Sequence, residues 1–139
     1  MKTVLLFFSI LLSGFYVNAQ EGNSITVTVT IENVLSDEGT LLVSLHTKDT
    51  FMKGPGIIDL AEKAQKGAVT LTFEDVMPGT YAIMAMHDAN DNKRMDYQDN
   101  GMPKESYGMS GNDMTMGPPT FDSAKFEVTD QNLEFTVRF

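Results

Sequence analysis

Asp and Asn side chains recur at short intervals along residues 88–99. Counted from Asp88, oxygen-bearing side chains occupy positions 1, 3, 5, 9 and 12, and position 7 offers a backbone carbonyl. This is the spacing of a twelve-residue calcium loop, in which alternate residues of a curling backbone converge on one hard cation. The predicted Ca²⁺ ligands are Asp88, Asn90, Asn92, Arg94 through its carbonyl, Asp96 and Asp99. Oxygen donors favour Ca²⁺, whereas zinc and copper prefer His, Cys or Met.

Two positions depart from the calcium-loop pattern. Position 6 is Lys93, where such loops carry Gly, and the sharp bend predicts a positive φ that costs a side-chain-bearing residue roughly 1 kcal/mol. Position 12 is Asp99 instead of the longer Glu. In the alternative interpretation, the Asp and Asn side chains cap turns by hydrogen-bonding their own backbone. Both interpretations stay open at the level of sequence.

His87 stands immediately before this loop, beside Asp88. Together with Glu105 these residues predict one alternative function, a small extracytoplasmic hydrolase with His87 as general base. Ser106 and Ser110 offer hydroxyls, but neither lies at a telling spacing from a His, and the sequence contains no nucleophile elbow or phosphate loop. In the plainer interpretation, His87 is a half-buried side chain that bonds the loop backbone and orients the turn.

Methionine is concentrated in the second half of the chain. Seven of the ten methionines lie between Met84 and Met116. In an exported protein, Met109, Met114 and Met116 predict a second alternative function, a periplasmic metal-handling protein that binds Cu(I) through soft thioethers. Methionine also fills irregular gaps beneath long loops, and this packing role accounts for the same residues without a metal.

The residues around the acidic segment also predict a ligand-binding surface. Glu105 and Tyr107 follow the acidic segment closely, and His87 precedes it. Carboxylates and aromatic rings beside an oxygen-rich loop suit the hydroxyl groups of sugars, and they also suit peptides. The leading prediction is therefore a non-enzymatic binding module for a protein, peptide or glycan ligand.

The segments that must position these residues show a period of two, which is typical of strands with one buried face. The predicted strands are 25–32, 41–46, 69–74, 81–86, 124–128 and 133–139, the last two forming a hairpin across 129–131. Residues 57–65 predict a short helix, and 88–120 predict a long loop without strands. These elements add up to an all-β fold, an antiparallel β-sandwich of six to seven strands.

The same alternation predicts which side chains face the interior. The core between the two sheets is expected to contain Val27, Val29, Val43, Leu71, Ile83 and Phe135. The strand at 81–86 is apolar on both faces, which predicts a central or covered position. His87 shares the inward parity of that strand, whereas His46 falls on a polar face and is expected to be exposed to solvent.

Three stretches, taken in order, carry a family resemblance. They are Asp-Val-Met-Pro-Gly-Thr-Tyr-Ala at 75–82 followed by His-Asp-Ala-Asn-Asp-Asn at 87–92, then residues 101–110 and 118–124. They resemble the bacterial family catalogued as domain of unknown function 2141, whose members usually have Gly at the place of Lys93 and often an aromatic residue at that of Met109. The turn before Tyr81 is also similar to that of prealbumin-like and immunoglobulin-like sandwich modules. The resemblance implies architecture and no activity, with Met109 as a hydrophobic filler.

The N-terminus predicts export. Lys2 precedes an apolar run over 4–16, and small residues at 17 and 19 form a cleavage site after Ala19. Residues 1–19 are therefore a predicted cleaved signal peptide, and 20–139 a single domain of a periplasmic or secreted protein. No later stretch is apolar enough to span a membrane. The net charge of −9 argues against nucleic acid and anionic membranes as partners.

Overall fold

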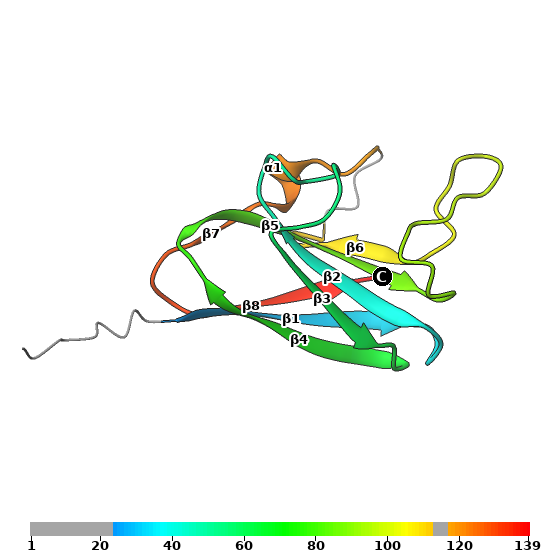
Figure 1. Ribbon diagram of the computed structural model, residues 1–139, viewed down its shortest axis with the longest axis horizontal. Helices are drawn as coiled ribbons and strands as arrows, with labels where there is room; N and C mark the ends of the chain where they lie inside the picture. The colour runs from blue at the N-terminus through cyan, green and yellow to red at the C-terminus, as the bar shows by residue number, and fades with distance from the viewer. Residues whose placement is uncertain (1–23, 113–116) are drawn as a thin grey trace, which may run out of the picture.

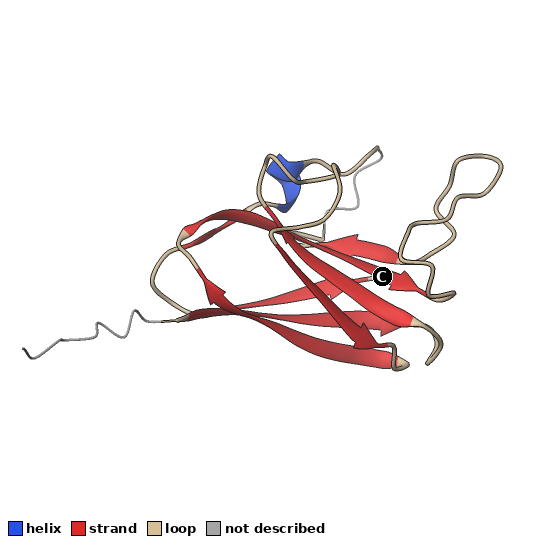
Figure 2. Ribbon diagram, viewed as in Figure 1, coloured by secondary structure: helices blue, strands red, loops and turns tan. Residues whose placement is uncertain are grey.

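Two β-sheets packed face to face form the body of the molecule (Figures 1 and 2). The computed structural model describes residues 24–112 and 117–139. Its elements are β1 (Ile25–Val34), β2 (Thr40–His46), β3 (Ile58–Lys63), β4 (Gly67–Val76), β5 (Gly79–Asp88), β6 (Tyr107–Met109), α1 (Phe121–Ala124), β7 (Phe126–Val128) and β8 (Leu133–Arg138). The predicted all-β sandwich is confirmed.

Some predictions fall on parts of the chain that are not described. The predicted signal peptide, residues 1–19, and two methionines of the metal-handling alternative, Met114 and Met116, lie outside the described residues. Within the described ranges, no helix has the length and apolar character needed to cross a membrane.

The smaller sheet has the strand order β4-β1-β8. Alternate side chains of β1 are completely buried, including Val27, Val29 and Ile31, because a strand presents every second residue to the same face. The other face carries cross-strand pairs of threonine hydroxyls, such as Thr28 with Thr72 at 3.1 Å. β1 pairs with β4 in antiparallel fashion but with β8 in parallel, which the prediction of a purely antiparallel sandwich did not include.

The larger sheet has the order β3-β2-β5-β6, and β7 also pairs with β5. β5 is therefore central, as its two apolar faces predict. Its inner face places Ile83 and Ala85 in the main core between the sheets. Its outer face places Ala82 in a second cluster with Phe51 and Met109, and the packing role predicted for Met109 is confirmed.

Two segments adopt strands where none was predicted. The helix predicted for 57–65 is wrong, because residues Ile58–Lys63 form β3, which pairs with β2 along its whole length. The backbone N–H and C=O groups along the edge of β2 need hydrogen-bond partners. The free energy gained by pairing them with residues 58–63 outweighs the weak helix propensity of this stretch. The predicted strandless loop at 88–120 contains the three-residue strand β6, which is too short to show an alternation in sequence.

The predicted C-terminal hairpin is also wrong. β7 pairs with β5 and β8 pairs with β1, so the intervening residues carry the chain from one sheet to the other. Phe135 consequently lies on an edge strand and is only partly buried, with its ring 4.3 Å from that of Phe126. The other five predicted core residues are buried, as expected.

His46 is buried, contrary to the prediction that it is exposed; only 4% of its surface is accessible. The connection after β2 folds back over it, so that Thr50 Oγ1 lies 3.2 Å from its Nδ1 and the ring of Phe51 packs edge-on at 6.0 Å. Burial lowers the pKa of His46 below its ordinary value, because the charged imidazolium loses its hydration, and the nearby charge of Asp59 opposes this in part.

Candidate binding pocket and acidic loop

The acidic loop (residues 88–99) begins with a carboxylate that is built into the turn. Asp88 is 1% exposed, and its two oxygens accept hydrogen bonds from the backbone N–H groups of Asn92 at 3.1 Å and Lys93 at 2.7 Å. Lys93 has φ +61°, so the predicted positive φ is confirmed. Asp88 thereby satisfies backbone donors that the tight turn leaves without partners.

Asp96 hydrogen-bonds to two side chains in the middle of the acidic loop. One of its carboxylate oxygens accepts hydrogen bonds from the side-chain amides of Asn90 at 2.8 Å and Asn92 at 2.7 Å, and Arg94 Nε lies 3.7 Å from the other oxygen. The hydrogen bond from Asn90 is the largest of the effects that hold the pKa of Asp96 below its ordinary value. Four predicted calcium ligands, Asp88, Asn90, Asn92 and Asp96, thus belong to one hydrogen-bonded turn.

Asp99 stands apart from this turn. The chain doubles back between Asp96 and Lys104, where the Lys104 N–H donates to the Asp96 carbonyl at 2.8 Å, and the resulting loop projects beyond the sheets (Figure 1). Asp99 lies in this projection, beside Gln98, and no hydrogen bond in the described part of the chain joins it to the other predicted ligands. Within residues 24–112 and 117–139, no three His, Asp or Glu side chains are gathered closely enough to hold a metal ion.

His87 ends the buried face of β5 and is 5% exposed, so its predicted inward orientation is confirmed. Its Nε2 lies 2.7 Å from the carbonyl oxygen of Glu38, and its ring stacks on that of Phe139 with an angle of 9° between the planes. Because a carbonyl can only accept, Nε2 must carry the proton, which makes Nδ1 of the neutral ring an acceptor.

Glu105 approaches the acidic loop from the connection just before β6. Its Oε2 accepts a hydrogen bond from the Asp96 backbone N–H at 2.7 Å, and the carboxylate is held beside the loop by that bond. The neighbouring Ser106 carbonyl accepts from the His87 backbone N–H at 2.8 Å. The first bond fastens Glu105 to the acidic loop, and the second fastens Ser106 to the end of β5.

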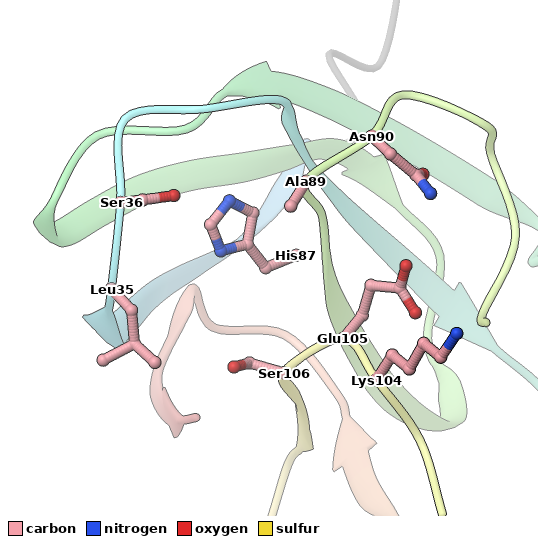
Figure 3. Close-up of a pocket in the computed structure, with 8 residues that line it drawn as sticks. All are labelled: Leu35, Ser36, His87, Ala89, Asn90, Lys104, Glu105 and Ser106. Carbon is pink, nitrogen blue, oxygen red and sulfur yellow. The ribbon is translucent and has the colours of Figure 1, made fainter. Parts of the chain in front are cut away.

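A pocket of about 320 Å³ lies where these segments meet (Figure 3). It is lined by Leu35, Ser36, His87, Ala89, Asn90, Lys104, Glu105 and Ser106. Two members of the predicted ligand surface, His87 and Glu105, are therefore brought together. The third, Tyr107, does not line the pocket; it is paired with Met86 and shares the outer face of the sheet.

The family comparison covers nearly all of this architecture. The family described as "Uncharacterized protein conserved in bacteria (DUF2141)" matches residues 29–136. The chain belongs to this family. Its match extends from β1 into β8 and includes the acidic loop and every residue of the pocket. No curated protein and no solved structure matches the chain.

The sequence of this DUF2141 member did not reveal one wall of the pocket. Leu35 and Ser36 lie in the β1–β2 connection (residues 35–39), about fifty positions before His87, and enter the site through the pairing of Leu41 with His87. Gly39 permits their close approach: its φ is +72°, and a Cβ there would lie 2.1 Å from the Asp88 carbonyl oxygen. Gly39, in the stretch Asp-Glu-Gly at 37–39 between two predicted strands, was the signal available in the sequence.

The residues of the hydrolase alternative have other hydrogen-bond partners. His87 Nε2 contacts Glu38, and both oxygens of Asp88 accept from backbone N–H groups. Ser110 is buried, where its hydroxyl donates to the Ala124 carbonyl at 2.5 Å and accepts from the Ile83 N–H at 2.9 Å. Among the described residues, no serine hydroxyl hydrogen-bonds to His87.

Proposed function

We propose that this protein is an exported, non-enzymatic binding module that holds a small polar ligand in the pocket between the β1–β2 connection and the acidic loop. One observation carries the proposal: His87, Asn90 and Glu105 line the same pocket although they come from before, within and after the acidic loop. Loops fixed at the end of a rigid sandwich are well suited to hold polar groups for a ligand.

The hydrogen bonds around the pocket favour binding over hydrolysis. A general base must reach the proton it removes, and a nucleophile must reach its base. Here no serine hydroxyl among the described residues hydrogen-bonds to His87, and Asp88 is engaged in holding the turn. Backbone hydrogen bonds hold the side chains of His87 and Asp88 in place, which supports a role for this end of β5 in recognising a ligand.

We expect protein isolated from the envelope of an expressing bacterium to begin at Gln20 and to carry a bound small molecule, both measured by native mass spectrometry. Ser36→Trp should lose the bound molecule, because the indole fills the pocket from its wall. The control Met77→Trp places the same side chain on an exposed turn at the other end of β5 and should retain it. A soluble cytoplasmic chain that begins at Met1 would contradict export, and unchanged binding by Ser36→Trp would contradict the pocket.

Calcium binding by the acidic loop is the second part of the proposal. The side chains of Asp88, Asn90, Asn92 and Asp96 carry oxygens within one hydrogen-bonded turn, which supports them as the side-chain ligands, with the carbonyl of Arg94 as a fifth. The amide oxygens of Asn90 and Asn92 accept from the backbone N–H groups of Asn92 and Arg94, at 3.3 Å and 3.0 Å, so turning them to a cation means rotating each amide by 180° and exchanging these bonds for the ion. Asp99 is not needed in this narrower ligand set.

Added Ca²⁺ is expected to raise the melting temperature by several degrees, since a hundredfold excess over Kd stabilises the folded state by about 2.7 kcal/mol. EDTA should reverse the effect, and Mg²⁺ should produce less, because it demands a tighter octahedron. Asp96→Ala should abolish the response, whereas the matched Asp99→Ala should keep it. Lys93→Gly should strengthen it, because Gly adopts φ +61° without strain. An unchanged melting temperature in millimolar Ca²⁺ would leave turn capping as the role of the loop.

A further inference from the structure

β3 forms a free edge of the larger sheet in the part of the chain that the structure describes. It pairs with β2 on one side, and no described strand pairs with its other side (Figure 1). A free edge presents a row of backbone N–H and C=O groups, to which another extended chain can bind as an additional strand. The residues that present these groups, and the side chains beside them, decide which chain fits.

The hydrogen bonds to β2 fix the direction of each backbone group of β3. The N–H of Ala64, directly after the strand, donates to the Gly39 carbonyl at 3.1 Å, so these two residues form a hydrogen-bonded pair. Such pairs recur at every second residue of an antiparallel ladder, so the even-numbered residues of β3 bond to β2. The backbone groups of Asp59, Ala61 and Lys63 therefore point to the free edge, and all three residues are exposed.

The side chains on this edge fit a second copy of the same strand. When two copies run antiparallel about a two-fold axis at Ala61, each Ala61 lies opposite its counterpart. Asp59 then lies opposite Lys63 of the second copy, and Lys63 opposite Asp59 of the second copy, because each is two residues from the axis. Opposite charges directly across an antiparallel pair stabilise it, and like charges destabilise it. Shifting the register by two residues loses both charge pairs.

We propose that β3 binds β3 of a second copy, so that the two larger sheets join into one continuous sheet across a two-fold axis at Ala61. Charged side chains on an edge block its pairing with most strands, but in this register the same charges attract each other, so the edge selects its own copy. The net charge of −9 repels two copies at a distance, but salt at about 0.1 M screens exposed charges beyond roughly 10 Å. The pockets of the two copies then lie at opposite ends of the joined sheet, since the paired strands run in opposite directions.

Disulfide trapping tests the register, because the chain has no cysteine of its own. Ala61→Cys places the new side chain opposite its counterpart, where the Cα atoms of a hydrogen-bonded antiparallel pair are about 5.5 Å apart, within the span of a disulfide. We expect oxidation of this variant at about 0.15 M salt to give a covalent dimer on a non-reducing gel. The control Ala68→Cys makes the same change at an exposed position of β4, the open edge of the smaller sheet, and should stay monomeric. Equal cross-linking of the two variants would overturn the proposal.

Sedimentation equilibrium of the cysteine-free protein measures the dimer itself. Lys63→Glu places two pairs of like charges across the axis and should raise the dissociation constant about tenfold or more. Lys104→Glu makes the same change of charge just before β6, at the opposite edge of the sheet, and should raise it far less. Ala61→Pro removes a donor at the free edge but no bond to β2, so it should abolish the dimer while circular dichroism retains the sheet signal. A chain that is monomeric at millimolar concentration, or equal effects of the two charge changes, would show that β3 is not the interface.

Discussion

Replacing Gly39 with Ala is expected to destabilise the domain by about 2–5 kcal/mol and to displace the wall of the pocket. The residue has φ +72°, which costs an alanine roughly 1–2 kcal/mol. Its Cβ would also lie 2.1 Å from the Asp88 carbonyl oxygen and 2.7 Å from the Ala89 Cα, and both are backbone atoms that cannot rotate away. Relieving such a contact by moving packed backbone costs about 1–3 kcal/mol more. Urea unfolding measures the sum.

Gly101 provides the matched control for this substitution. Its φ is +81°, but a Cβ there would meet no atom within 4 Å. Gly101→Ala should therefore carry only the backbone cost, roughly 1–2 kcal/mol. Equal losses in the two variants would show that the approach of the β1–β2 connection to the acidic loop contributes nothing to stability.

Phe73→Ala is expected to cost about 3–5 kcal/mol, because Phe73 is completely buried between the sheets and its removal leaves a cavity. That is a large part of the 5–15 kcal/mol by which a domain of this size is typically stable. Phe135 is only partly buried on edge strand β8, so Phe135→Ala should cost at least 1 kcal/mol less. Denaturant titration of both variants compares them directly, and equal losses would contradict the difference in burial.

The sequence predicted which faces of the strands are buried more reliably than it predicted their partners. Val27 and Ile83 lie in the core because alternation is a local property of a strand. Pairing is not local: β3 became a strand because β2 offered an edge, and β8 joined β1 instead of β7. His46 was misplaced for a related reason, since the segment that covers it follows β2 through a turn with no periodic signal.

In the candidate site, too, the residues placed by local hydrogen bonds were predicted and those placed by distant pairing were not. The turn from Asp88 to Asp96 was predictable because Asp and Asn hydrogen-bond residues a few positions away. Asp99 was included by counting along a continuous curl, but the chain reverses once the Lys104 N–H bonds the Asp96 carbonyl. Ser36 was not predicted at all, because only the strand register places it near His87.

The parallel pairing of β1 with β8 has a consequence for the folding rate. The paired residues Glu32 and Arg138 are 106 positions apart, so β1 acquires its second neighbour only after a very long loop has closed. The entropy of that closure must be lost before the contact gains anything, and domains rich in such distant contacts fold slowly. Until β8 docks, β1 presents an open edge of unpaired N–H and C=O groups. A chain folded as far as β7 is therefore the species most prone to pair with another copy.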